Sequence, residues 1–336
     1  MRKQYTCIAE TLYAFFSYLI IMSVEQINRT QFYIGGAVGR ILPVQSDEYL
    51  GSVKRIDNFA LRKANALVRC GYRLKMWCLY LCRIRGTEIY AQDHITFSQA
   101  LICGGKYTLL EDGPGIYRNC TKNRVIHPFK NSFLRMLLVW FTWGRIQGNI
   151  LGLNNQCINR IVTDSKDVDA EILKGRKFQL FDLRDLWMNS TIEKQQFVLK
   201  VFGMTEELRR ECCKAETIIL TQPFCDDAVL TQEEMVEIYR PYVEKYKEGG
   251  VIIKNHPRDW NDYKKYFPDA ICVNTAVPMQ LLLFVGINFK RAVTVFSTSI
   301  SDFPKGTELI VLGTTVHPKL SARYGILSQS DIASRA

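Results

Sequence analysis

Three basic side chains lie within five residues of one another, at Lys254, His256 and Arg258. They follow the apolar run 251–253, which predicts a buried strand, and Pro257 ends that strand's hydrogen-bond ladder. Open α/β sheets bind their ligands beyond the ends of such strands. A His-Pro pair at a strand end is more often ordinary turn chemistry, but this segment predicts a positively charged site for an anionic ligand.

Two neighbouring carboxylates, Glu111 and Asp112, follow another strand-like run at residues 106–110. In isolation they predict a polar turn. Beside an imidazole among cations they supply the carboxylate that a group transfer from an anionic donor needs. One carboxylate next to another has a raised pKa, which suits a base near neutral pH. Asp226 and Asp227, which also come after a predicted strand, are the alternative base.

The composition is that of a globular protein with an excess of positive charge. The chain has 336 residues, 47% of them hydrophobic, and a formal net charge of +11. The length predicts two domains, and the charge predicts anionic partners such as a phosphorylated substrate or a membrane surface. Nucleic acid is not expected as a partner, because the sequence has no zinc-ligand spacing, recognition-helix pattern or RNA-binding aromatic motif. The eleven cysteines are scattered, which favours free thiols and a cytoplasmic location.

Metal dependence is not expected either. The Asp167-Val168-Asp169 triplet matches the Asp-x-Asp motif of divalent cation sites, but it lies in a predicted linker and not after a strand. The histidines are few and widely spaced: His94, His127, His256 and His317. We therefore predict neither a metal nor another cofactor.

Two apolar segments bear on membrane association. Residues 12–24 are too short to span a bilayer and no small-residue cleavage site follows them. We therefore predict a first strand at 4–9 and a buried helix at 11–26. Residues 129–145 combine tryptophan, leucine and basic residues, as a helix on the inner face of the cell membrane would. A core helix packed between the domains is favoured, because the polar face is thin.

Strands alternate with helices along the chain, which predicts βαβ units and parallel sheets. We expect an α/β protein of the GT-B type, with two Rossmann-like domains at 1–165 and 166–336 whose parallel sheets face a cleft; one large sheet is the alternative. The predicted strands are 4–9, 31–35, 88–92, 106–110, 217–222, 251–255, 270–273, 292–296 and 308–312. The predicted helices are 11–26, 58–83, 96–103, 231–247, 259–267 and 278–285.

An ordered set of short motifs resembles a known family. The motifs are Ala91-Gln92-Asp93-His94, Glu111-Asp112-Gly113, Gly115-Ile116-Tyr117, Leu220-Thr221-Gln222-Pro223, Lys254-Asn255-His256-Pro257-Arg258 and Phe296-Ser297-Thr298-Ser299. Together they are similar to the bacterial sialyltransferases of glycosyltransferase family 52, the lipooligosaccharide and capsule sialyltransferases, which share such motifs with the bacterial polysialyltransferases. The resemblance extends to about Pro304. Gln280 departs from it, since related sequences often carry an acidic residue near this position.

The resemblance implies an inverting, metal-independent transfer of sialic acid from CMP-sialic acid to a galactose-type hydroxyl of a bacterial surface glycan. His256 would donate to the departing phosphate, as general acid or electrostatic stabiliser, and Glu111 or Asp112 would deprotonate the acceptor. The N-terminal domain would take the acceptor and the C-terminal domain the donor. Hydroxyls after the strand at 292–296 would cap the next turn and form an anion cradle. The expected donor contacts are Lys254, Pro257, Arg258, Gln222, Gln280, Ser297, Thr298 and Ser299.

Two other functions are also compatible with the sequence. One keeps the fold but uses another nucleotide-sugar donor, which Gln280 and the pocket residues would decide. The other is a non-catalytic scaffold on the membrane surface, using the positive charge and residues 129–145. The expected partners are a nucleotide-sugar donor and a glycan acceptor, lipid-linked or free, with peripheral contact to the inner membrane and a homodimer as further options.

Overall fold

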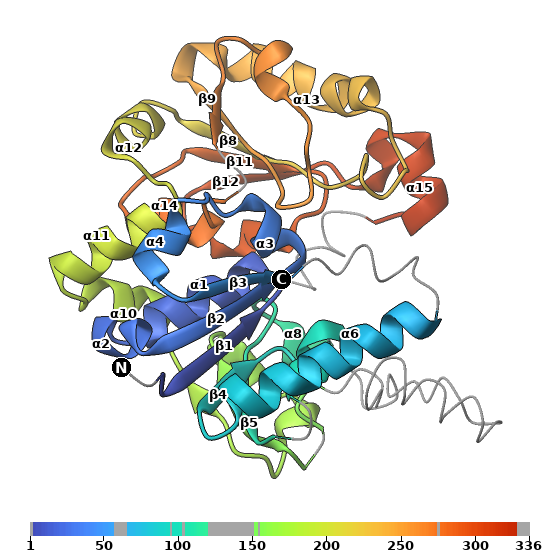
Figure 1. Cartoon of the computed structure of the whole chain (residues 1–336). Coiled ribbons are helices and arrows are strands. Elements are labelled where there is room, and N and C mark those ends of the chain that lie inside the picture. Colours follow the sequence, from blue (N-terminus) through green and yellow to red (C-terminus); the bar gives the residue numbers. More distant parts are fainter. Residues whose placement is uncertain are drawn as a thin grey trace. The chain divides into compact units, whose positions relative to one another are not determined.

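The computed structural model of the chain describes residues 3–56, 66–94, 96–102, 105–119, 151–153, 155–273 and 276–327. It has two compact α/β units, Met1–Val201 and Phe202–Ala336, each built on its own parallel sheet (Figure 1). Within the described part of the chain, no helix is both long enough and apolar enough to cross a membrane. The segment 129–145 lies outside the described residues.

The sheet of the first unit has seven parallel strands in the order β3-β2-β1-β4-β5-β6-β7. The chain winds from β1 to β3 and then, starting at β4, in the opposite direction to β7, so the strand order reverses between β1 and β4. At such a reversal the carboxyl ends of the strands open a crevice where ligands bind. The strands are β1 (Tyr5–Ala9), β2 (Thr30–Gly35), β3 (Val53–Ile56), β4 (Glu88–Ala91), β5 (Tyr107–Leu109), β6 (Cys157–Val162) and β7 (Gln179–Leu180).

Helices surround this sheet. The side chains of β1 and β2 are almost all buried, as expected for strands covered on both faces. The α-helices are α1 (Leu12–Ile21), α2 (Val24–Asn28), α3 (Gly36–Ile41), α4 (Ser46–Leu50), α6 (Ala66–Leu79), α7 (Thr96–Ile102), α8 (Ile116–Asn119), α10 (Leu183–Met188) and α11 (Ile192–Val201). Shorter turns are η1 (Tyr80–Ile84), which is π-helical, and the 3-10 helices η3 (Ser165–Asp167) and η4 (Glu171–Leu173).

The sheet of the second unit has five parallel strands in the order β10-β9-β8-β11-β12, so its strand order reverses between β8 and β11. The strands are β8 (Thr217–Leu220), β9 (Val251–Lys254), β10 (Ile271–Val273), β11 (Arg291–Thr294) and β12 (Glu308–Val311). The helices are α12 (Glu206–Cys212), α13 (Gln232–Tyr246), α14 (Met279–Phe284) and α15 (Pro318–Tyr324), with 3-10 turns η5 (Lys247–Gly249), η6 (Tyr263–Lys265), η7 (Thr298–Asp302) and η8 (Thr314–Val316).

The division between the units differs from the predicted boundary at 165/166. Residues after 166 continue the first unit, because β7 pairs with β6, α10 contacts α1 and α11 contacts α4. The polar composition of 154–177 suggested a linker, but part of this segment is a buried strand and two turns packed on the first sheet. The two units separate between Val201 and Phe202.

Two predicted helices also differ. Residues 11–26 form α1 and α2, because Ser23 and Gln26 make a capping box that starts a second helix. In the predicted helix 259–267, only the 3-10 turn Tyr263–Lys265 forms. Asn255 Nδ2 donates to the carbonyl oxygens of Asp259 and Asn261, so these side-chain bonds take the place of helical ones.

Candidate active site

The carboxylate of Asp112, just after β5, is held by two side chains that follow β4. Gln92 Nε2 donates to Asp112 Oδ1, and His94 Nε2 lies 2.7 Å from Asp112 Oδ2. The side chain of Asp112 is 24% exposed, so a hydroxyl from solvent can reach it. A carboxylate fixed in direction, with lone pairs to spare, meets the geometric requirement for a general base.

Gln92 connects this carboxylate to the reversal point of the first sheet. The side chain is fully buried. Its Oε1 accepts from the backbone N–H groups of Glu10 (2.6 Å) and Thr11 (3.1 Å), which follow β1, and its Nε2 also donates to Thr11 Oγ1 at 2.9 Å. One amide thus bridges the ends of β1, β4 and β5 and keeps Asp112 at the mouth of the crevice.

Glu111 points into the interior and is only 1% exposed. Its Oε1 accepts from the hydroxyl of Thr163, and its Oε2 has no hydrogen-bond partner among the described residues. Burial, with the charge of Asp167 second, raises the pKa of Glu111 well above its usual range. The neighbouring carboxylate, which the sequence suggested as the cause, is the smallest of the contributions. Of the two predicted carboxylates, Asp112 is therefore the accessible one.

His94 forms an imidazole–carboxylate pair with Asp112. Burial acts to lower the pKa of His94, but the hydrogen bond to Asp112 and the charge of that carboxylate raise it above its usual value. Its Nδ1 is buried and has no hydrogen-bond partner in the described part of the chain. The pair consequently holds a proton close to Asp112 at a pH where a free histidine has lost it.

In the second unit, two backbone amides fix the loop that carries His256. The N–H of His256 donates to Thr221 Oγ1, and the N–H of Arg258 donates to His256 Nδ1, both at 3.0 Å. Because Nδ1 accepts, the proton of the neutral ring lies on Nε2. Burial and the positive charges of Arg258 and Lys254 lower the pKa of His256 to about 4. At neutral pH this side chain is an uncharged hydrogen-bond donor.

A buried network lies beneath this loop. Lys254 Nζ donates to the carbonyl of Asn255 at 2.9 Å, and burial lowers the pKa of Lys254 to about 7 in spite of the charge of Asp259. Asp259 accepts from the hydroxyl of Thr221 and, at 3.0 Å, from the hydroxyl of Tyr263. Since Thr221 also holds the backbone of the His-Pro loop, these groups lock the ends of β8 and β9 together.

Arg258 is engaged by the two carboxylates that the sequence suggested as alternative bases. Its Nη1 lies 3.0 Å from Asp226 Oδ2 and 2.8 Å from Asp227 Oδ1. Both carboxylates are partly exposed and belong to the same unit as His256. Asp226 and Asp227 therefore neutralise the cation that follows the His-Pro pair, and they still have surface through which a substrate can reach them.

Other predicted donor contacts lie around the reversal point between β8 and β11. Gln222 follows β8 and is buried. Ser297 occupies the position before η7, but its hydroxyl makes no capping bond; its N–H instead donates to Thr294 Oγ1 at 3.1 Å. Thr298 opens η7, and Pro257 and Ser299 are half-buried. The strand-end positions agree with the prediction, whereas the predicted hydroxyl cap is not formed at Ser297.

Gln280, in the first turn of α14, is part of the same region. Its Nε2 donates to Asp302 Oδ2 at 2.7 Å and so connects α14 to the end of η7. An acidic residue at this position would place two carboxylates side by side. The glutamine thus fits its neighbour, and it holds the turn that carries Ser297, Thr298 and Ser299.

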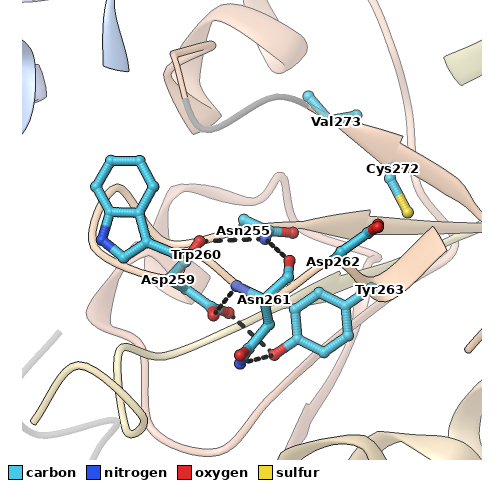
Figure 2. Close-up of a pocket in the computed structure, with 8 residues that line it drawn as sticks. All are labelled: Asn255, Asp259, Trp260, Asn261, Asp262, Tyr263, Cys272 and Val273. Carbon is cyan, nitrogen blue, oxygen red and sulfur yellow. Dashed lines mark hydrogen bonds between the residues drawn. The ribbon is translucent and has the colours of Figure 1, made fainter. Parts of the chain in front are cut away.

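An open pocket of about 230 Å³ adjoins the His-Pro loop. Figure 2 shows Asn255 between the indole of Trp260 on one side and Cys272 and Val273 on the other. The other lining residues are Asp259, Asn261, Asp262 and Tyr263, so none of the eight is basic. This lining suits an uncharged polar group better than a phosphate.

Sequence reasoning missed the residues that position the site. Gln92, Thr221 and Asp259 lie within or next to the motifs, yet their partners are far away in sequence, 81 residues for Gln92 and Thr11 and 38 for Thr221 and Asp259. The sequence feature that could have identified these three residues is a polar side chain at the end of a predicted buried strand. In the described residues, no cluster of three His, Cys, Asp or Glu side chains can hold a metal ion, and metal independence stays a prediction.

The model of the family described as glycosyltransferase family 52 matches residues 61–320. The chain belongs to glycosyltransferase family 52. The family expected from the motifs is confirmed, and with it the assignment as a glycosyltransferase. A protein of Haemophilus influenzae described as uncharacterized is 27% identical over 243 residues, 72% of this chain and 74% of that protein.

Solved structures show the same fold. A 2,6-sialyltransferase from Photobacterium sp. JT-ISH-224, in a ternary complex with the donor product CMP and the acceptor lactose, matches with a TM-score of 0.61 and 11% identity, over 91% of this chain and 71% of that one. The GT-B domain of a sialyltransferase from Photobacterium damselae matches with a TM-score of 0.54 and 12% identity, over 92% and 90%. This member of glycosyltransferase family 52 has the GT-B-type α/β fold that the sequence predicts.

Proposed function

We propose that this glycosyltransferase transfers sialic acid from CMP-sialic acid to a sugar hydroxyl, with inversion and without a metal ion. The ordered motifs support this choice, as does the CMP and lactose bound to the Photobacterium 2,6-sialyltransferase of the same fold. The observation that carries the proposal is His256, an uncharged Nε2–H donor fixed at the end of β9 beside the reversal point of its sheet.

The second unit takes the donor. CMP-sialic acid carries a negative phosphate and a negative sugar carboxylate, and Lys254, His256 and Arg258 supply the opposing charge and hydrogen bonds. Gln222, Pro257, Gln280, Ser297, Thr298 and Ser299 complete the contacts. Because burial lowers the pKa of Lys254 to about 7, an arriving phosphate favours the ammonium form and draws a proton into the site.

In the reaction, the acceptor oxygen bonds to the anomeric carbon of sialic acid while the bond from that carbon to the phosphate oxygen of CMP breaks. The acceptor proton goes to the base, and CMP leaves as a phosphate monoester whose growing negative charge His256 Nε2–H stabilises. Because the pKa of His256 is about 4 in the free protein, we assign it a hydrogen-bonding role rather than full proton transfer.

Asp112 is our choice of base, and the first unit is the acceptor side. Asp112 is accessible and held by Gln92 and His94, whereas Glu111 is buried and supports the site from inside. Asp226 and Asp227 are the second choice, since they lie in the same unit as His256 but are paired with Arg258. Single Asn substitutions at these three positions separate the two choices.

The acceptor proposed is a galactose-type hydroxyl of a bacterial surface glycan, lipooligosaccharide or capsule, as the family motifs imply. A cytoplasmic location, a lipid-linked acceptor, peripheral contact with the inner membrane and a homodimer stay predictions. Light scattering of the purified protein and fractionation of cells test the oligomeric state and the location.

The deciding experiment offers the purified protein a panel of nucleotide sugars and a lactose acceptor, with and without chelator. We expect CMP release from CMP-sialic acid, a sialylated product with inverted anomeric configuration, and unchanged rates in chelator. If the protein turned over only another nucleotide sugar, the fold assignment would stand and that sugar would replace CMP-sialic acid as the proposed donor. Absence of turnover with every donor would favour the non-catalytic scaffold.

A further inference from the structure

Helix α8, which comes directly after the turn that carries Asp112, is too short to be stable by itself. It has four residues, Ile116–Asn119, whereas isolated helices shorter than about twelve residues are marginal in water. The strand before the turn, β5, has only three residues. Gly115, with a φ of 77°, lets the chain bend from the turn into the helix. The direction of Asp112 therefore depends on the contacts that hold α8 in place.

Two side chains fasten α8 to β6 and to the turn η3 that follows it. The hydroxyl of Tyr117, which is fully buried, donates to the carbonyl of Ile161 in β6 at 2.7 Å. The guanidinium of Arg118 donates through Nε to Asp167 Oδ1 at 2.7 Å and through Nη2 to Asp164 Oδ2 at 2.6 Å. One side chain thus holds two carboxylates that lie 46 and 49 residues away in sequence.

The pairing also balances charge close to Glu111, whose pKa the charge of Asp167 helps to raise. Asp167 is 0% exposed, and its Oδ2 has no hydrogen-bond partner among the described residues. A buried carboxylate that loses its cation keeps an uncompensated charge, which destabilises the structure strongly. The planar fork of Arg118 can bond both carboxylates at once, whereas a lysine ammonium is a single point of charge.

We propose that Arg118 is a positioning residue for the base: by pairing with the two carboxylates at η3 it fixes α8, and α8 fixes the turn that aims Asp112. Gln92 and His94 hold the carboxylate itself from the side of β4. Arg118 holds the backbone that carries it from the side of β6, the neighbour of β5 on the other side. The inference rests on the proposed function of Asp112.

The test replaces Arg118 by lysine, which keeps the positive charge but loses the fork. In steady-state assays of the full chain with CMP-sialic acid and lactose, Arg118→Lys should lower kcat about tenfold and leave both KM values within about twofold, because the base is misplaced and the substrates still bind. Asp164→Asn, which leaves the buried pair with Asp167 intact, should lower kcat about threefold.

The matched control is Arg55→Lys in the edge strand β3 of the same sheet. Arg55 is 26% exposed, close to the 28% of Arg118, and it pairs with one carboxylate, that of Asp47, and donates to three backbone carbonyls. Its replacement loosens a comparable set of bonds away from Asp112 and should keep kcat. Circular dichroism and the melting temperature verify that each variant folds.

A second measurement does not need turnover. The pair of His94 with Asp112 reports the position of the carboxylate, because the hydrogen bond and the charge of Asp112 raise the pKa of His94. NMR titration should show a lower pKa of His94 in Arg118→Lys and an unchanged one in Arg55→Lys. If the protein turns over no nucleotide sugar, the proposed function fails, and this titration still decides whether Arg118 holds Asp112.

Three results overturn the proposal. One is wild-type kcat and an unchanged His94 pKa in Arg118→Lys, since the pairing would then only stabilise the fold. Another is a raised KM for lactose at unchanged kcat, which would make Arg118 a contact of the acceptor. A third is an equal loss of turnover in Arg55→Lys. If Arg118→Lys does not fold, the contradicting result is Asp164→Asn with wild-type kcat and an unchanged His94 pKa.

Discussion

Glu111 and His94 in the first unit shift their proton equilibria in the opposite direction to Lys254 and His256 in the second unit. In the first unit, burial raises the pKa of Glu111, and Asp112 raises that of His94, so protons are retained. In the second unit, burial lowers the pKa of Lys254 to about 7 and that of His256 to about 4, so protons are released. The first cluster keeps a proton on the imidazole beside Asp112, and the second suits an anion that brings its own negative charge.

The largest expected effect tests whether the catalytic base lies in the first unit. Asp112→Asn keeps the volume of the side chain but removes its basicity, and we expect turnover to fall about a thousandfold. Glu111→Gln should cost less, because that carboxyl is buried. Steady-state rates with CMP-sialic acid measure both. A larger loss in Asp227→Asn or Asp226→Asn than in Asp112→Asn would move the base to the second unit.

The role of His256 is the next largest effect. His256→Ala removes one preorganised donor to the departing phosphate, and we expect turnover to fall about a hundredfold with a smaller change in KM. His317→Ala is the matched control in the same unit, since His317 lies at the start of α15, where its Nδ1 accepts from the N–H of Lys319 and its Nε2 lies 3.7 Å from Glu234 Oε1. Full activity of His256→Ala would contradict the mechanism.

The lowered pKa of Lys254 predicts a pH dependence of CMP binding. Between pH 7 and 9 the free protein loses the ammonium form, and a phosphate binds the ammonium better than the amine. The Kd of CMP should therefore rise with pH, by up to about tenfold per pH unit. Calorimetric titrations measure this slope. Lys254→Met should flatten it and the exposed Lys245→Met should not; an equal slope in all three proteins would refute the assignment.

The smallest expected effect concerns the pKa of His94 in the first cluster. Asp112→Asn should lower the pKa of His94, because burial then acts against less opposing charge. In the wild type the pair stabilises the fold below pH 6.5, and this stabilisation is lost as the pH rises through the raised pKa. NMR titration of the histidine ring signals measures the shift, with Asp226→Asn as control. An unchanged pKa would mean that the pair is not formed in solution.

Sequence alone predicts the strands that follow simple patterns. The β-branched runs at 217–222 and 251–255 correspond to β8 and β9, because buried parallel strands are continuously apolar. It does not predict β6, whose Asn159 and Arg160 are buried. Arg160 is accommodated through a hydrogen bond to the carbonyl of Lys177, 17 residues away, and no local pattern reveals such a partner.

The candidate site is likewise predictable where it depends on local sequence, and not where it depends on contacts distant in sequence. The motifs locate both clusters at strand ends, since the chemistry of the residues is visible in sequence. Which of two adjacent carboxylates faces solvent depends on the end of a strand of three residues, and the structure gives Asp112 rather than Glu111. The pairing of Gln92 with the backbone after β1 depends on strand order, which sequence does not contain.

The pairing of Arg258 with Asp226 and Asp227 has a consequence for ionic strength. An open cationic patch gathers mobile salt ions, and a ligand must compete with them. Here the counter-ions are part of the polypeptide, at 3.0 and 2.8 Å from the guanidinium. A donor phosphate that binds Arg258 displaces these carboxylates and not mobile salt ions, so few ions are released into solution. Donor affinity should then depend weakly on salt, and neutralising both aspartates should make that dependence steeper.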